Sequence, residues 1–284
     1  MPGTQTGPWL WTNALADNDG LNPANYSRDG GATASSMFGP GDPVQWSLHT
    51  VGGTTADIPF FATAITCLDA TISHYLSACS NLGSSGAGFA NLTIAGDLDY
   101  VPTSDGTNVN WYLTDAPSVG GNVRVEIAAE SLTGGNENVM GFFLANAQTV
   151  GGSAYLSGGS WDGSIGQYPV ICARGTDHAT ITGDVQVDGA VGWVVRTAIG
   201  GTFIHTGAPL VLVLLQDCAA STALQDAVLA AAADGAAING KINVSYNGAY
   251  PTGWDNELQT WAEGSVGAAL VAAGWSIYFE ATWG

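Results

Sequence analysis

Side chains that could carry acid–base chemistry are scattered along this chain. The four histidines are His49, His74, His178 and His205. They follow neither the H-E-x-x-H spacing of a zinc protease nor an H-x-H pair. Asp177 precedes His178 and could form half of a catalytic pair, but the G-x-S-x-G turn that presents a nucleophilic serine does not occur. We therefore interpret the histidines as loop or surface residues.

Two carboxylates could also act as the acid and base of a glycosidase, which needs them about 5–9 Å apart. Asp97 and Asp99 form the one local pair, on the polar face of an expected strand. Acids on a strand face are far more often solvated than catalytic. We therefore expect no catalytic residue and no enzymatic activity.

Two short segments approach the motifs of ion or nucleotide sites. Asp17 and Asp19, in DNDGLN, have the carboxylate spacing of a calcium loop, but the series that ends in a bidentate Glu is missing. The alternative is a polar turn built from Asx residues. Residues 235–242, GAAINGKI, resemble a phosphate loop, yet Ile242 replaces the Ser or Thr that binds magnesium. We keep Asp17 and Asp19 as the calcium candidate and expect no cofactor and no other metal.

Ten tryptophans are the second chemical feature. Exposed rings could stack on sugars, but tryptophan fills cores and interfaces more often. Two segments carry the residues that we expect at an interface between copies of the chain. These residues are Trp9 and Trp11 near the N-terminus, and Trp275, Ile277, Phe279 and Trp283 in an apolar segment that ends the chain.

The charge balance excludes several classes of partner. The chain has 24 acidic residues against five basic ones, a formal net charge of −19 over 284 residues. Without a cluster of Lys or Arg it cannot neutralise nucleic-acid phosphates or dock electrostatically on anionic lipid. Charged residues are only 10% of the chain. A polar, uncharged surface can be covered by identical neighbours without desolvating many ions, which is costly.

Alternating apolar residues predict strands at Val44–Val51, 92–101, 110–114, 122–127, 139–145, 168–173, 179–187 and 192–198. Glycine doublets such as Gly120-Gly121, Gly151-Gly152 and Gly200-Gly201 separate many of them. Short strands with turn signals every ten to fifteen residues are typical of an antiparallel β-sandwich or barrel. We find no convincing internal repeat. The fold class we predict is mainly β (α+β), an antiparallel sandwich or barrel with about three helices.

The three helices are expected at different places in the chain. Residues 58–81 show an apolar stripe at spacings of three and four, Ser221 can cap a helix through about Ala233, and Asp255 can cap a third. Residues 209–216 predict a buried strand and 275–283 a closing strand. We expect residues 1–42 to form an irregular N-terminal arm or loop and residues 43–284 to form a β-rich domain. An alternative is a division near residue 200 into 43–200 and 201–284.

The cysteines and the N-terminus bound the cellular context. Cys67, Cys79, Cys172 and Cys218 include no C-x-x-C pair, so we expect small buried thiols rather than a zinc site. The first residues lack the basic and apolar regions of a secretory signal peptide. No stretch approaches the about 20 apolar residues of a membrane-spanning helix. We therefore expect a product of the host cytoplasm that does not contact a membrane.

In texture the whole chain resembles virion proteins of phages and archaeal viruses, such as tail-tube, minor-tail and capsid subunits. The resemblance rests on the Trp-bearing segment 7–11, the glycine-punctuated strands and the apolar segment 275–283. It implies a self-assembling structural subunit located in the virion, with copies of itself and other virion proteins as partners. The alternative is an extracellular β-sandwich protein that binds or cleaves glycans through Trp platforms.

Overall fold

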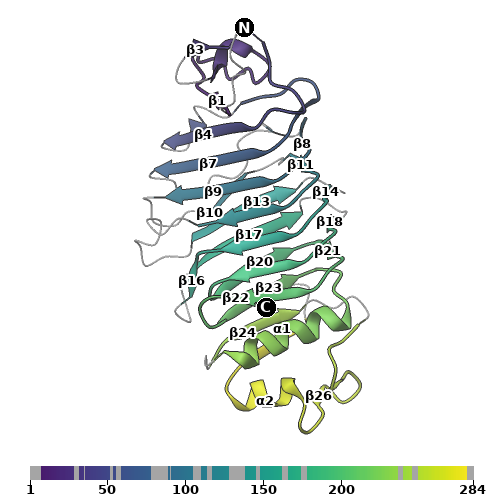
Figure 1. Ribbon diagram of the computed structural model, residues 1–284. Helices are drawn as coiled ribbons and strands as arrows, with labels where there is room; N and C mark the ends of the chain where they lie inside the picture. Colours follow the sequence, from purple (N-terminus) through teal and green to yellow (C-terminus); the bar gives the residue numbers. More distant parts are fainter. Residues whose placement is uncertain are drawn as a thin grey trace.

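In the computed structural model, strands recur in a fixed order between three sheets. The structure describes residues 8–28, 32–34, 36–51, 54–55, 59–77, 89, 91–104, 110–113, 117–127, 138–144, 148–161, 166–173, 178–235, 239–244 and 249–279. Within these ranges the chain forms an elongated body whose strands stack one above another along its length (Figure 1).

Sheet A is the longest of the three. It contains β1 (Trp9–Trp11), β2 (Tyr26–Arg28), β3 (Ala32–Thr33), β4 (Val44–Val51), β5 (Thr54–Thr55), β7 (Ala70–Ser77), β9 (Leu98–Ser104), β12 (Val123–Glu126), β15 (Ala154–Ser157), β19 (Val185–Asp188) and β22 (Phe203–Thr206).

Sheets B and C complete the walls. Sheet B contains β10 (Asn110–Leu113), β13 (Asn138–Leu144), β16 (Ser160–Trp161), β17 (Gly166–Ala173), β20 (Val191–Val195), β23 (Leu212–Gln216), β24 (Lys241–Val244) and β27 (Ser276–Tyr278). Sheet C contains β6 (Ile65–Cys67), β8 (Leu92–Ile94), β11 (Ser118–Val119), β14 (Thr149–Val150), β18 (Ala179–Ile181) and β21 (Thr197–Ile199).

Successive coils visit the sheets in the order C, A, B. The series β8-β9-β10 is followed by β11-β12-β13, β14-β15-β17, β18-β19-β20 and β21-β22-β23. Each strand pairs in parallel with its counterpart one coil later, as β12 does with β9 and β15. This connectivity defines a parallel β-solenoid, in which each coil rests on the one before it.

The expected antiparallel sandwich or barrel is therefore wrong, although the chain is mainly β. The glycine doublets are turns between sheets, not hairpins, so the neighbouring strands run parallel. The repeat escapes notice in the sequence because the coils differ in length. Val123 pairs with Ala154, but Val185 pairs with Phe203 after a much shorter stretch of chain.

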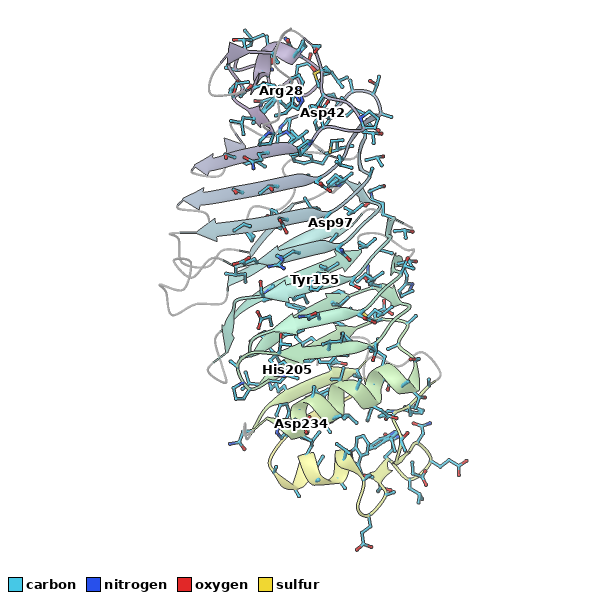
Figure 2. All side chains as sticks on the ribbon, viewed as in Figure 1. Arg28, Asp42, Asp97, Tyr155, His205 and Asp234 are labelled. Atoms are coloured by element: carbon cyan, nitrogen blue, oxygen red, sulfur yellow. The ribbon has the colours of Figure 1, made fainter. Side chains whose placement is uncertain are left out.

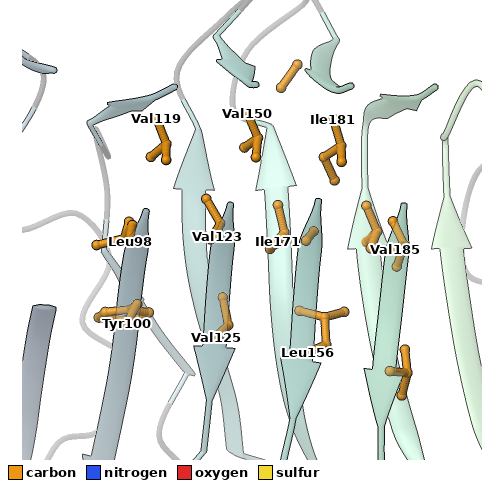
Figure 3. Packing of buried hydrophobic residues seen from close by; sticks show 14 of the residues in the cluster. Leu98, Tyr100, Val119, Val123, Val125, Val150, Leu156, Ile171, Ile181 and Val185 are labelled. Carbon is orange, nitrogen blue, oxygen red and sulfur yellow. The ribbon is translucent and has the colours of Figure 1, made fainter. Parts of the chain in front are cut away.

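The core consists of columns of aliphatic side chains, one per coil, stacked along the solenoid. In sheet C one column is Cys67, Ile94, Val119, Val150, Ile181 and Ile199. In sheet A a second is Ala70, Leu98, Val123, Ala154, Val185 and Phe203. All are buried. Figure 3 shows part of both columns, with Val119, Val150 and Ile181 from the first and Leu98, Val123 and Val185 from the second. Full burial of each Val, Leu or Ile stabilises the fold by about 1.5–3 kcal/mol.

Burial also explains the cysteines that the structure describes. Cys67 and Cys218 are buried free thiols, as we expected, and Cys67 belongs to the sheet C column. Desolvation raises the pKa of the Cys67 thiol to about 12, which keeps it protonated and unreactive. Cys79 and the side chain of Cys172 lie outside the described part.

The corner between sheets C and A brings backbone segments of adjacent coils into direct contact. A column of glycines lies here: Gly96, Gly121, Gly152, Gly183 and Gly201. The backbone N–H of each glycine after the first donates to the carbonyl oxygen of the glycine in the preceding coil, at 2.8–3.0 Å. A Cβ on Gly152 would lie 2.9 Å from both the carbonyl carbon and oxygen of Gly121. Only glycine allows this approach.

Polar side chains reinforce the same corner. The corner ladder comprises Asp69, Asp97, Asn122, Ser153, Asp184 and Thr202. The Asn122 backbone N–H donates to Asp97 Oδ1 at 2.7 Å, and the Ser153 N–H donates to Asn122 Oδ1 at 2.9 Å. In the same way, the backbone N–H groups of Asp97, Asp184 and Thr202 each donate to a side-chain oxygen of the preceding ladder residue. Figure 2 places Asp97 on this edge of the solenoid. The ladder therefore links every coil from Asp69 to Thr202.

Residues 8–28, 32–34 and 36–42, the N-terminal cap, close one end. The 3-10 helix η1 (Pro23–Asn25) leads into β2, and β1 pairs in parallel with β4. Trp9, Trp11, Tyr26 and Phe38 are buried here, and the ring centroids of Phe38 and Trp46 lie 6.1 Å apart. The expected irregular arm thus contains strands and covers the open end of the core.

α1 (Thr222–Asp234) and residues 249–279, the C-terminal cap, close the other end (Figure 1). Ser221 caps α1 by accepting from the Leu224 N–H at 3.2 Å, as the sequence predicted. Leu224, Val228 and Leu229 are buried, and α1 contacts β22, the last strand of sheet A. α2 (Val266–Ala272) begins after Ser265 and packs on α1.

Two expected helices are wrong. Residues 58–81 contain β6 and β7 rather than a helix, because two strands with a corner between them shift the apolar alternation into a helix-like stripe. Asp255 caps a turn of the β25 (Trp254–Asp255) and β26 (Thr260–Trp261) hairpin. The described part therefore has two α-helices, not three.

Three segments expected as single strands each contain two. Residues 92–101 divide into β8 and β9, and 179–187 into β18 and β19, at the glycine corner. Residues 192–198 divide between β20 and β21 at Arg196, whose φ is 50°. The closing strand is β27, and residues 280–283 lie outside the described part. The alternative division near residue 200 stays a prediction. None of the helices in the described ranges is long and apolar enough to cross a membrane.

The glycine corner generates a stability prediction. We expect Gly152→Ala to lower the free energy of unfolding by about 1–3 kcal/mol, because the new methyl group forces adjacent coils apart. Chemical denaturation measures the change. Gly41→Ala is the matched control, since a Cβ there has nothing within 4 Å, and it should leave stability unchanged or slightly higher. Equal effects of the two variants would show that close coil contact is unimportant.

Candidate functional site: an aromatic pocket in the C-terminal cap

A short hairpin of the C-terminal cap places aromatic and amide side chains around one pocket. β25 and β26 pair antiparallel, with Trp254 opposite Trp261 and Asp255 opposite Thr260. Asp255 Oδ1 accepts from the Glu257 and Leu258 N–H groups at 2.9 and 3.0 Å. The loop is thus held by its own Asx turn.

Gln259 has a left-handed backbone, with φ of 53°. This conformation costs free energy for any residue other than glycine and is found often at binding sites. The Gln259 Nε2 group donates to the Asn256 carbonyl oxygen at 2.6 Å and to Asn256 Oδ1 at 3.0 Å. The loop therefore fixes two side-chain amides against each other.

The two tryptophans of the hairpin belong to an aromatic cluster with Tyr250 and Phe279. The ring centroids of Trp254 and Phe279 lie 4.7 Å apart at an interplanar angle of 40°. Trp254 and Trp261 lie 5.1 Å apart, and Tyr250 and Phe279 lie 5.8 Å apart, both nearly edge to face. Each such pair adds about 0.5–1.5 kcal/mol beyond area burial, so these ring contacts stabilise the pocket wall.

The pocket has a volume of about 330 Å³, at the lower end of the about 300–1,000 Å³ range of small-molecule sites. Its aromatic walls are Tyr250, Trp254, Tyr278 and Phe279. Asn256, Gln259 and Ile277 complete the lining, which includes no charged side chain among the residues that the structure describes. This composition suits binding by stacking and neutral hydrogen bonds, not proton transfer.

The residues expected at an interface between copies fall into two groups. Trp9, Trp11 and Trp275 are 3%, 7% and 3% exposed within their own chain, which leaves little of each ring for a neighbour. Ile277 and Phe279 line the pocket. Trp283 lies outside the described residues. A contact with a second copy through residues 275–283 stays a prediction.

Asp17 and Asp19 form a hydrogen-bonded turn. The Asp17 Oδ1 atom accepts from Asn25 Nδ2 at 2.6 Å and from the Asp19 N–H at 3.0 Å, and Asp19 Oδ1 accepts from the Leu21 N–H at 2.9 Å. In the described ranges no three His, Cys, Asp or Glu residues gather as a metal site would require. The Asx-turn alternative accounts for this segment.

Other candidate chemical groups serve as structural contacts. Asp97 belongs to the corner ladder, while Asp99 lies 3.8 Å from the Arg124 guanidinium. His178 Nε2 lies 3.0 Å from the Asp217 carbonyl oxygen. His205, in β22, places its Nε2 atom 3.0 Å from the carbonyl oxygen of Gly189, the residue after β19 (Figure 2). Asp177 and the side chains of His49 and His74 lie outside the described part.

Sequence reasoning missed Trp254, Asn256, Gln259 and Tyr278. The signal was present, because WDNELQTW places two tryptophans symmetrically around a polar turn. The expectation of a helix from Asp255 concealed this pattern. Residues 235–242 do not have the surroundings of a phosphate loop, because such a loop connects a strand to the helix that follows it. Here the order is reversed: the helix α1 comes before the segment and the strand β24 comes after it.

In comparisons with known proteins, no family model, no curated protein and no solved structure matches this chain.

Asp17 generates a pH prediction. Hydrogen bonds from the Asn25 side chain and the Asp19 backbone lower the pKa of Asp17 below its usual value of 3.8. The ionised carboxylate therefore stabilises the folded state above about pH 4, and this contribution is lost as the pH falls through the lowered pKa. Thermal unfolding between pH 2 and 5 should show a shallower loss in Asp17→Asn than in the wild type. Glu263→Gln, an exposed change of equal charge, should retain the wild-type slope. Parallel slopes for all three proteins would contradict the assignment.

Proposed function

We propose that this protein is a non-catalytic structural subunit of a phage or archaeal virus particle, where it works as one of many copies packed side by side. A β-solenoid closed at both ends supports this proposal. The N-terminal cap lies over one end of the core and α1 contacts β22 at the other, which disfavours stacking of another copy at the ends. We therefore place the contacts between copies on the sides of the solenoid.

The observation that carries the proposal is a group of small uncharged side chains on the outer face of β4 and β7, at positions whose side chains the structure describes. Along these strands Val44, Trp46 and Ile72 point into the core. The alternating residues Gln45, Ser47, Thr71 and Ser73 therefore point outward. We call these four residues the β4–β7 flank. Ser47 and Ser73 are exposed and paired across the strands.

Burial of this flank against a second copy carries little desolvation cost. Small hydroxyl and amide groups can exchange water for hydrogen bonds to a neighbour, whereas buried charges cost several kcal/mol each unless paired. The four flank residues are uncharged, although the exposed Asp99 of β9 pairs with Thr71 at the edge of the flank, and Glu126 and Asp188 lie on β12 and β19 of the same sheet. A neighbour that covers the flank itself therefore desolvates no ion of this chain, whose net charge is −19.

The negative charge itself suits a particle that contains DNA. A polyanionic surface repels nucleic acid instead of retaining it. Three described arginines, Arg28, Arg124 and Arg196, each lie beside an aspartate, which reduces their attraction for phosphate.

The assembly prediction uses light scattering and negative-stain microscopy. We expect the purified wild-type protein to form multimers of side-by-side solenoids. Ser47→Glu and Ser73→Glu should each reduce the particle mass, because a carboxylate in the flank meets a like charge or remains unpaired.

Thr63→Glu, an exposed change outside the flank, is the control and should assemble like the wild type. A wild-type protein that stays monomeric across protein and salt concentrations would overturn the proposal. Multimers that tolerate both flank substitutions would exclude the flank as the contact.

A further inference from the structure

The C-terminal cap has the composition of a ligand site rather than of a core. Tyr278 is 45% exposed although it lines the pocket. Leu258, in the same hairpin, is 71% exposed. We propose that this pocket binds the sugar ring of a neutral saccharide. The inference goes beyond the structural role and does not require that the chain assembles.

The aromatic walls offer the apolar half of such a site. A sugar ring carries C–H groups on its faces, and these bind the negative face of an aromatic ring. Trp254 and Phe279 diverge by 40° at a centroid distance of 4.7 Å, and Tyr278 adds a third ring. Packing against Trp261 and Tyr250 holds these walls before any ligand binds, so little entropy is lost in ordering them.

The amides offer the polar half. In the Asn256–Gln259 pair, the Gln259 Nε2 group is the donor and Asn256 Oδ1 is an acceptor. Gln259 Oε1 and Asn256 Nδ2 take no part in that pair, so one acceptor and one donor can face a ligand. Sugar hydroxyls both donate and accept, and therefore match an amide pair of this kind.

Charge selects a neutral ligand. Among the described residues no Lys or Arg lines the pocket, and Asp255 and Glu257 lie on the same hairpin. Phosphates and uronic acids would meet negative potential without a compensating cation. An aliphatic ligand would leave the two amides without partners, at a cost in affinity.

The test combines a glycan array with calorimetry on the intact chain. The array carries neutral di- and oligosaccharides of glucose, galactose, mannose and N-acetylglucosamine, with uronic-acid glycans as the charged set. We expect saturable binding to at least one neutral glycan, and none to the charged set. Calorimetric titration with the best neutral disaccharide then gives the affinity of each variant.

Two variants remove ligand contacts by different routes. Gln259→Gly deletes the amide and also relieves the left-handed backbone, which glycine tolerates, so it should fold at least as well as the wild type. Tyr278→Ala removes an exposed ring. Each should weaken sugar binding at least tenfold. Phe60→Ala removes a ring that is 54% exposed in the described N-terminal part, and it should bind like the wild type.

Three results would overturn the inference: no neutral glycan bound, binding unchanged in both pocket variants, or preference for the charged set. Light scattering on the same samples reports assembly separately. If Tyr278→Ala alters particle mass while no sugar binds, the pocket is a contact between copies and not a saccharide site. Sugar binding by a monomer would leave this inference standing while the assembly proposal fails.

Discussion

Backbone contact between coils at the corner of sheets C and A is the constraint on which this fold depends. Gly96, Gly121, Gly152, Gly183 and Gly201 lie so close that each binds the next through a backbone hydrogen bond, and any side chain there would collide with the coil below. The corner ladder then fixes the register of the following strand in sheet A. A shift of the pairing by one residue would turn the buried side chains of that sheet toward solvent. The aliphatic columns can therefore stack only because this corner holds every coil in the same phase.

The same constraint decides how much the sequence could reveal. The alternation of apolar and polar residues predicted β4, β12 and β13 close to their observed bounds, because a strand with one buried face repeats every two residues. The prediction failed at corners, where two residues between strands interrupt the alternation of buried and exposed positions. Leu68 and Asp69 between β6 and β7 made two strands resemble one helix. Parallel pairing could not be predicted because glycine is common both in hairpin turns and at solenoid corners. In addition, coils of unequal length leave no regular repeat in the sequence.

The site could be predicted only in part, for a related reason. Ile277 and Phe279 were recognised as important apolar residues, but their neighbours Trp254 and Gln259 come from a hairpin more than fifteen residues earlier. The N-terminal tryptophans were expected at an interface, yet the open end of a solenoid needs a cover, and burial in the cap meets that need. The proposed contact between copies lies on the side of this capped solenoid, and the proposed sugar site lies in the cap at its C-terminal end.

Native-state hydrogen exchange at the corner tests this account most directly. Gly121, Gly152 and Gly183 lie in bends on the outside of the solenoid, where a loop amide would exchange within seconds to minutes. If the coils depend on contact at this corner, those three amides exchange as slowly as the amides of the buried strands β12 and β19 and open only with global unfolding. Exchange at the rate of exposed loops, while β12 and β19 stay protected, would contradict the central claim.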